Sequence, residues 1–120
     1  MGYTRGRYRM GKFVVGDVVA VPFPFSDLTG KKLRPAVVLA TIERDGLILC
    51  QITSKSFTSA IAIKISEADF SEGRLPLTSY VRPDKLFTAE FSIIQKLKGR
   101  LKPQLLQTIL ATTRDLFTLE

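Results

Sequence analysis

The chain has 120 residues, of which 45% are hydrophobic and 24% are charged, a composition typical of one folded domain and not of a disordered or fibrous protein. It has one cysteine and no histidine. This excludes an intramolecular disulfide, a cysteine-based zinc cluster, and the triads and zinc motifs that need imidazole. Any catalysis must therefore use Asp, Glu, Arg, Lys, Tyr, Thr or Ser. The net charge of +7 points to a polyanionic partner such as a nucleic acid.

Residues 1–12 are predicted to form a flexible basic tail. This tail carries +4 and no acid, so residues 13–120, which we expect to form a single domain, carry only +3. Arginine and tyrosine alternate in the tail and suit RNA, although a plain unstructured terminus is the favoured explanation. No segment approaches the roughly 20 apolar residues of a membrane span, and the tail lacks the apolar core of a signal peptide. We therefore expect a soluble, cytoplasmic protein with no membrane partner.

Strands are predicted in the first half of the domain. Residues 13–22 are rich in β-branched valine, and Gly16-Asp17 among them indicates a bulge or turn. The proline-rich end of this segment leads into a polar loop at 26–33. Residues 35–42 and 47–53 are predicted as two strands joined by a hairpin, because Asp-Gly suits a tight turn.

The second half of the domain shows shorter patterns. Isoleucine alternates with other residues over 61–65, which predicts a half-buried strand, and Ser66 is predicted to begin a short helical turn. Residues 79–81 look extended and should end at Arg82, because a residue before proline is pushed away from helix. Two more short strands are expected at 86–91 and 92–97. A turn is expected at 98–100.

The last segment is predicted to be a helix. Pro103 suits the first helical position, and apolar residues recur at helical spacing from Leu105 to Phe117. This apolar face should cover one side of a sheet. About five to seven short strands and one terminal helix predict a mainly β protein, either a small barrel or a sandwich.

Several polar residues lie where predicted strands begin or end. Arg34 lies directly before an apolar run, Thr53 and Ser54 lie where a strand ends, and Arg82 and Asp84 flank a proline. Strand ends and loops are where binding groups collect, because the scaffold holds them rigidly. These residues are therefore the candidates for a binding or catalytic site.

These residue types can cleave RNA without histidine or a metal ion. Arginine holds phosphate oxygens through two parallel hydrogen bonds, and hydroxyl groups add donors. A carboxylate can take the proton of the 2′-hydroxyl if its pKa is raised toward neutrality. RNA then supplies its own nucleophile, and positive groups stabilise the charge that builds on phosphorus. DNA lacks this hydroxyl and would not be cut in this way.

Each of these positions also has a purely structural explanation. Arg34 can pair with Asp17 or Asp27 across the loop. The Thr53-Ser54 pair suits the end of a strand, and Arg82-Pro83-Asp84 suits a turn with a solvated ion pair. From the residues alone, a nuclease is one option among several.

Four segments resemble the MazF/PemK (Kid) toxins of bacterial toxin–antitoxin pairs, in their order and approximate spacing. They are Gly16-Asp17-Val18-Val19, Arg34-Pro35-Ala36-Val37-Val38-Leu39, Ile52-Thr53-Ser54 and Val81-Arg82-Pro83-Asp84. The resemblance covers residues 13–118. It implies an SH3-like β-barrel with a C-terminal helix, usually as a homodimer. It also implies an endoribonuclease that needs no metal or cofactor, cuts single-stranded RNA and leaves a 2′,3′-cyclic phosphate.

The resemblance implies roles for four residues. Arg34 and Thr53 would hold the phosphate, and Asp84 would be the general base. Arg82 would stabilise charge rather than donate a proton, because the pKa of arginine lies above about 12. The loop at 26–33 departs from the Glu-Gln-x-Gly stretch of many relatives, and the basic tail lies outside the family pattern, so an RNA sequence preference does not carry over.

The partner implied by the resemblance is an antitoxin with an acidic, partly disordered tail that folds on the toxin. A positive groove would suit either RNA or this tail, and its candidate lining residues are Phe23, Phe25, Lys31, Lys32, Ser54 and Lys55.

An alternative of a different class is a non-catalytic protein on the same barrel. It would be a nucleic-acid binder, a gyrase poison similar to CcdB, or an inactive relative. CcdB-like toxins act through C-terminal residues that include a tryptophan, and this chain has no tryptophan.

Overall fold

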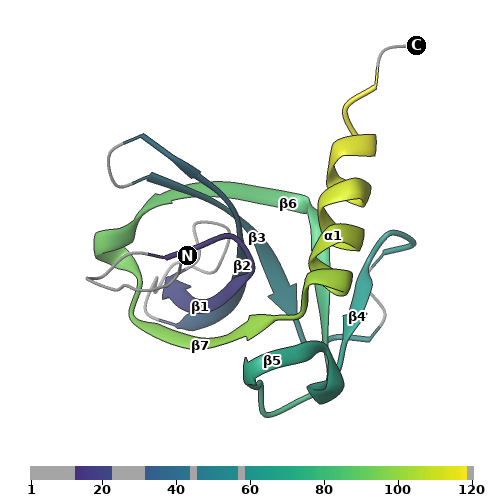
Figure 1. Cartoon of the computed structure of the whole chain (residues 1–120), viewed down its shortest axis with the longest axis horizontal. Coiled ribbons are helices and arrows are strands. Elements are labelled where there is room, and N and C mark those ends of the chain that lie inside the picture. Colours follow the sequence, from purple (N-terminus) through teal and green to yellow (C-terminus); the bar gives the residue numbers. More distant parts are fainter. Residues whose placement is uncertain (1–12, 23–31, 44–45, 57–58, 119–120) are drawn as a thin grey trace.

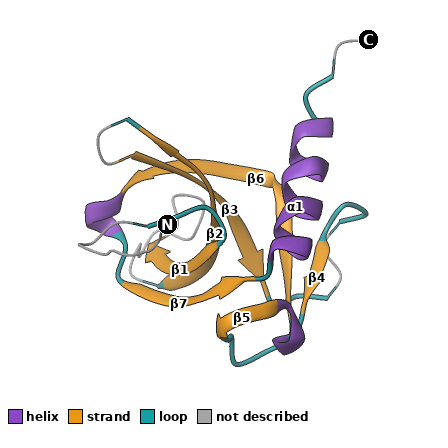
Figure 2. Cartoon of the chain, in the orientation of Figure 1, coloured by secondary structure: helices purple, strands orange, loops and turns teal. Residues whose placement is uncertain are grey.

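The computed structural model describes residues 13–22, 32–43, 46–56 and 59–118. Within these residues, seven strands form one antiparallel sheet and a single α-helix follows them (Figures 1 and 2). The elements are β1 (Asp17–Pro22), β2 (Leu33–Ile42), β3 (Gly46–Thr53), β4 (Ile63–Ile65), the 3-10 turn η1 (Glu67–Asp69), β5 (Phe70–Gly73), β6 (Ser79–Glu90), the 3-10 turn η2 (Phe91–Ile93), β7 (Lys96–Leu101) and α1 (Pro103–Asp115). The predicted mainly β fold with a C-terminal helix is confirmed.

The sheet curls on itself. Its strand order is β4-β6-β3-β2-β1-β7-β5, so β6 and β7 flank the β1–β3 meander on opposite sides. The chain passes from β6 to β7 through η2, and Figure 1 shows β6 and β7 curving around β1 and β2. This connection closes the curl into a barrel-like ring.

Two apolar clusters fill the two faces of the sheet. The helix cluster packs against α1 and contains Val18, Val37, Leu39, Cys50, Ile52, Ile65, Phe70, Val81, Leu101 and Ile109. The η2 cluster contains Val19, Val21, Ala36, Val38, Leu47, Leu49 and Phe87, with Phe13, Phe91 and Ile94 packed on it. Neighbouring residues of β1, β2 and β3 alternate between the two clusters. These strands are buried on both faces, which explains their unbroken valine and leucine runs.

Strand β6 differs from its prediction. It continues through the expected strand end at Arg82 to Glu90, because Pro83 lies in a bulge. Cys50 pairs with Leu86, whereas the next residue of β3 pairs with Arg82, so residues 83–85 have no counterpart. Proline cannot donate to a strand ladder, and a bulge needs no such bond.

The segment after β6 was also predicted wrongly. Residues 91–93 form η2 rather than the start of a strand, and the expected turn at 98–100 is the interior of β7. Gly99 marks a close approach of β5: a side chain there would collide with the Glu72 carbonyl and the Phe70 ring. Strand β5 was not predicted, and β4 is shorter than the expected strand at 61–65. The helical turn predicted to begin at Ser66 is confirmed as η1.

An ion pair between a buried aspartate and a partly exposed arginine fixes the start of β1. Gly16 has a φ of 99°, as the predicted turn requires. Asp17 is 1% exposed; it accepts hydrogen bonds from the Val14 amide at 2.9 Å and from Arg100 Nε at 2.9 Å. The proposed pairing of Asp17 with Arg34 is therefore wrong, and Asp17 instead ties β1 to β7.

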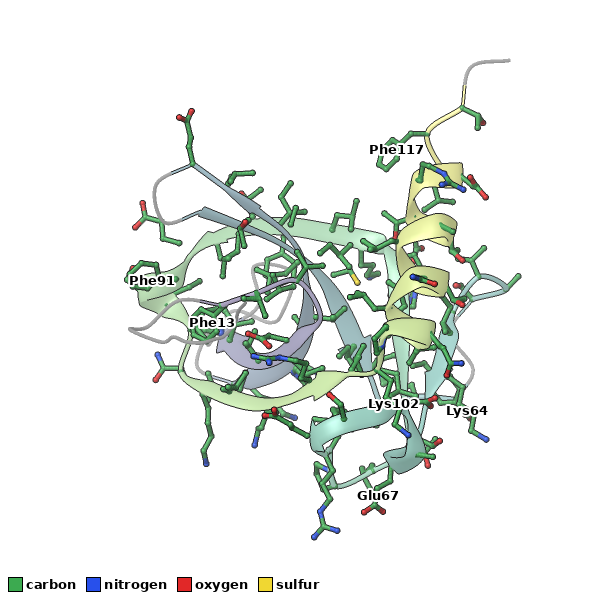
Figure 3. The ribbon with its side chains drawn as sticks, in the orientation of Figure 1. Phe13, Lys64, Glu67, Phe91, Lys102 and Phe117 are labelled. Carbon is green, nitrogen blue, oxygen red and sulfur yellow. The ribbon has the colours of Figure 1, made fainter. Side chains whose placement is uncertain are left out.

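Helix α1 begins at Pro103, as predicted, and buries Ile109 in the helix cluster. It ends at Asp115, so Leu116 and Phe117 lie beyond it, and Phe117 is 72% exposed (Figure 3). Their inclusion in the apolar face was wrong. Across the part of the chain that the structure describes, no helix has the length and apolar character to cross a membrane.

Candidate active site

Strands β2, β3, β6 and β4 share one face that is turned away from the helix cluster. Val37, Ile52, Val81 and Ile65, one from each strand, belong to that cluster. Side chains alternate along a strand, so residues one or three positions away from these point to the opposite face. We call this surface the site face, and it carries Arg34, Gln51, Thr53, Lys64, Tyr80 and Arg82.

Four residues of the site face form one row across the strands. Thr53 pairs with Tyr80, and Tyr80 pairs with Lys64 on its other side. Arg34 lies opposite Thr53 when the register of β2 and β3 is continued by two residues. The row therefore places a guanidinium, a hydroxyl, a phenol and an ammonium group on neighbouring strands.

The next row contains the second arginine. Gln51 pairs with Arg82, and Asp84 follows in the bulge of β6. Arg82 grips Asp84 with two hydrogen bonds, from Nε to Oδ1 at 3.0 Å and from Nη2 to Oδ2 at 2.8 Å. The side chains of Arg82 and Asp84 are 14% and 36% exposed. This is a fork-shaped ion pair in the bulge of β6, with Arg82 half-buried and Asp84 exposed.

The ion pair sets the protonation of both partners. The hydrogen bonds from Arg82 hold the pKa of Asp84 below its ordinary value, and the same bonds raise the pKa of Arg82. The RNA-cleavage chemistry expected from the sequence required a raised pKa of the carboxyl group, so the pKa of Asp84 is shifted in the opposite direction. It keeps Asp84 ionised and ready to accept a proton, at the cost of a weaker affinity for that proton.

Thr53 and its neighbours lie at the end of β3. The Thr53 hydroxyl accepts a hydrogen bond from the Lys55 amide at 3.2 Å, which orients its oxygen and leaves its proton to be donated elsewhere. Ser54 and Lys55 are exposed beside it. This short turn presents two hydroxyls and an ammonium group together.

A cleft of about 770 Å³ opens at the same end of β2 and β3. Arg34, Thr53 and Ser54 line it. Its other cationic lining residues are Lys32, Lys55, Lys96 and Lys98, and its apolar ones include Ala20, Ile52, Leu75 and Leu77. No acidic side chain is among the described lining residues, so the cleft is positive.

The structure thus brings five of the ten predicted site residues together in one cleft. Arg34, Thr53, Ser54, Lys32 and Lys55 share the cleft. Arg82 and Asp84 do not line it; Arg82 lies one row along the site face, and Asp84 lies in the adjacent bulge, hydrogen-bonded to Arg82. The other predicted positions, Phe23, Phe25 and Lys31, lie outside the described residues.

Among the described residues, no three His, Cys, Asp or Glu side chains gather closely enough to hold a metal ion.

A match to a family sequence profile assigns the chain to a protein family. The sequence profile of the family described as "PemK-like, MazF-like toxin of type II toxin-antitoxin system" matches residues 15–117. The chain belongs to this toxin family. No curated protein matches the chain significantly.

Solved structures share the fold of this PemK-like toxin at low sequence identity. An endoribonuclease in complex with its cognate antitoxin, from a mycobacterial species, is 20% identical with a TM-score of 0.63, covering 88% of this chain and 98% of its own. The Mycobacterium tuberculosis toxin MazF-mt6 is 16% identical with a TM-score of 0.65, covering 87% and 98%. MazF in the MazE–MazF structure from Deinococcus radiodurans is 14% identical with a TM-score of 0.65, covering 88% and 95%.

Sequence reasoning missed three residues of the site face in this PemK-like toxin. Tyr80 and Gln51 each lie two positions from a predicted site residue on the same strand, so strand alternation could have found them. Lys64 enters the row only through the pairing of β4 with β6, which no sequence signal revealed.

Proposed function

We propose that this PemK-like toxin is a metal-independent endoribonuclease that cleaves single-stranded RNA, mRNA included. The observation that carries the proposal is the site face, where Arg34 and Thr53 occupy adjacent strands and Arg82, which forms an ion pair with Asp84, lies one row away. Two guanidiniums, a hydroxyl and a carboxylate are sufficient for internal transesterification of RNA, because the 2′-hydroxyl is the nucleophile.

In the proposed reaction, Arg34 and the Thr53 hydroxyl hold the non-bridging oxygens of the scissile phosphate. Asp84 accepts the proton of the 2′-hydroxyl as the 2′-oxygen attacks phosphorus. The bond from phosphorus to the 5′-oxygen breaks, and this oxygen takes a proton from water; the protonated Asp84 then returns its proton to the hydroxide that is left, which restores the carboxylate. Arg82 stabilises the negative charge on the five-coordinate phosphorus. The products are a 2′,3′-cyclic phosphate and a free 5′-hydroxyl.

The positive cleft supports a second part of the proposal, an acidic antitoxin as partner. Its five cationic lining residues complement the tail of such a protein. The MazE–MazF structure and the mycobacterial complex each hold a toxin of this fold with an antitoxin. We further propose that the chain acts in the cytoplasm as a homodimer, the state that the resemblance implies.

The test is incubation of the purified protein with single-stranded RNA of varied sequence in EDTA, followed by analysis of the fragment ends. Cyclic phosphate ends that disappear in Arg34→Ala and Asp84→Ala support the proposal. Intact RNA with wild-type protein, in the presence of retained RNA binding, assigns the chain to the non-catalytic class instead.

A further inference from the structure

The row on the site face extends beyond the residues proposed to act on the phosphate. Tyr80 lies between Thr53 on β3 and Lys64 on β4, paired with both. Its ring is half-buried, whereas Lys64 is exposed and extends outward from β4 (Figure 3). Ile63 and Ile65 pack toward the helix cluster on either side of Lys64. The sheet thus holds this lysine on the same face as Tyr80.

The spacing of the row is fixed by the sheet. Neighbouring strands lie about 4.8 Å apart, so the backbone positions of Arg34 and Lys64, at the two ends of the row, are separated by three strand spacings, or about 14 Å. The backbone position of Tyr80 lies between those of the two cations in this row. A groove that alternates cations with aromatic faces is the arrangement that holds a single strand, since phosphates meet the cations and a base stacks on the ring.

We propose that Arg34, Thr53, Tyr80 and Lys64 form a binding track for single-stranded RNA. A base next to the scissile linkage stacks on Tyr80, and Lys64 pairs with the phosphate beyond it. This inference rests on the proposed nuclease function for the place of the scissile linkage. An acidic peptide would gain only from the two cations, whereas a nucleic acid also uses the aromatic ring between them.

The chain offers a direct optical probe of this track. It has no tryptophan and three tyrosines, and Tyr80 is the only one outside the basic tail of residues 1–12. A mixed-sequence single-stranded oligonucleotide with 2′-O-methyl groups cannot undergo transesterification, so its binding is measured apart from cleavage. Stacking should quench tyrosine fluorescence in the wild type, and the Tyr80→Leu variant should lose this quenching.

Affinity and its salt dependence test the two new residues separately. Tyr80→Leu should weaken binding of the oligonucleotide by about 5- to 100-fold, and Tyr80→Phe, which keeps the ring, should bind within about threefold of wild type. Lys64→Gln should reduce the slope of log affinity against log salt by about 0.7, the contribution of one phosphate contact on a single strand. Lys102→Gln is the matched control, because this exposed lysine lies at the start of α1, and its slope should equal that of wild type.

Three outcomes overturn the track. They are no binding of the oligonucleotide by wild type, equal affinities of Tyr80→Leu and wild type, and an unchanged salt slope in Lys64→Gln. An acidic peptide, polyglutamate, tests the other class of partner: if the two variants lose affinity for the peptide but not for the oligonucleotide, the surface binds protein and the track is wrong. Circular dichroism confirms that each variant is folded. If the binding tests overturn the track but the wild type still cleaves ordinary RNA, the nuclease proposal remains. If the binding tests give the expected pattern but no RNA is cleaved, only the nuclease proposal is refuted.

Discussion

Replacement of Asp84 by asparagine separates catalysis from structure at the centre of the site. The substitution keeps the shape of the side chain and removes its ability to take a proton. The ion pair with Arg82 is partly exposed, at 14% and 36%, so its loss should cost about 1 kcal/mol of folding free energy, or about fivefold in the folding equilibrium. A protein of ordinary stability stays folded after such a loss. Removal of a general base, in contrast, should lower kcat by about 10²- to 10⁴-fold.

The assay is single-turnover cleavage of a short RNA, with urea unfolding of each variant alongside. Glu90→Gln is the matched control, because Glu90 is an exposed acid on the same strand, β6. It should cleave at the wild-type rate. A kcat for Asp84→Asn within about tenfold of wild type would refute the assignment of Asp84 as proton acceptor and leave it only the role of holding Arg82.

The pH dependence gives an independent check on the same carboxyl group. Arg82 holds the pKa of Asp84 below its ordinary value, so the ionised form persists in acid. The ion pair is fully present above the unfolded-state pKa of about 3.9 and is lost as the pH falls through the lower folded value. The cleavage rate of the wild type should therefore not fall until the pH is below about 4, and the Asp84→Asn profile should lack this acid limb. A wild-type rate that already declines between about pH 6 and pH 5 would contradict this reasoning.

Three further predictions concern the scaffold. Asp17→Ala removes the buried acceptor of the Arg100 Nε–H and the Val14 amide and should cost about 2–4 kcal/mol in urea unfolding; a loss below about 1 kcal/mol would show that the pair is not structurally important. Gly73→Ala places a side chain at a φ of 69° and against the Lys98 carbonyl, and should destabilise the protein by about 2–3 kcal/mol, which an unchanged unfolding midpoint would disprove. Burial raises the pKa of the Cys50 thiol, so a thiol reagent at neutral pH should modify it only after unfolding; stoichiometric labelling of the native protein is the contrary result.

The elements that sequence predicted well are those whose signal is local. Strands β1, β2 and β3 bury both faces, and their β-branched and leucine runs are visible without knowledge of their partners. Pro103 and the helical spacing of the apolar residues that follow it indicate helix α1. The turn at Gly16-Asp17 is likewise encoded in the two residues that form it.

The features that sequence could not predict depend on distant partners. Pro83 indicates a strand end, and only the pairing of β6 with β3 turns it into a bulge that holds Asp84 beside Arg82. Gly99 indicates a turn, and only the approach of β5 makes it the middle of a strand. For the candidate site, the residue types could be recognised in the sequence, whereas Lys64 joins the proposed row only through the register of β4 with β6.

The pairing of β1 with β7 constrains how the chain reaches its folded form. The two partners of its ion pair, Asp17 and Arg100, are 83 residues apart. A nascent chain on the ribosome cannot form this seam until most of the polypeptide has emerged. Contacts between residues so distant in the sequence slow folding. The apolar faces of β1 stay exposed while the later strands are synthesised. The native ring should thus assemble late, after translation has passed β7.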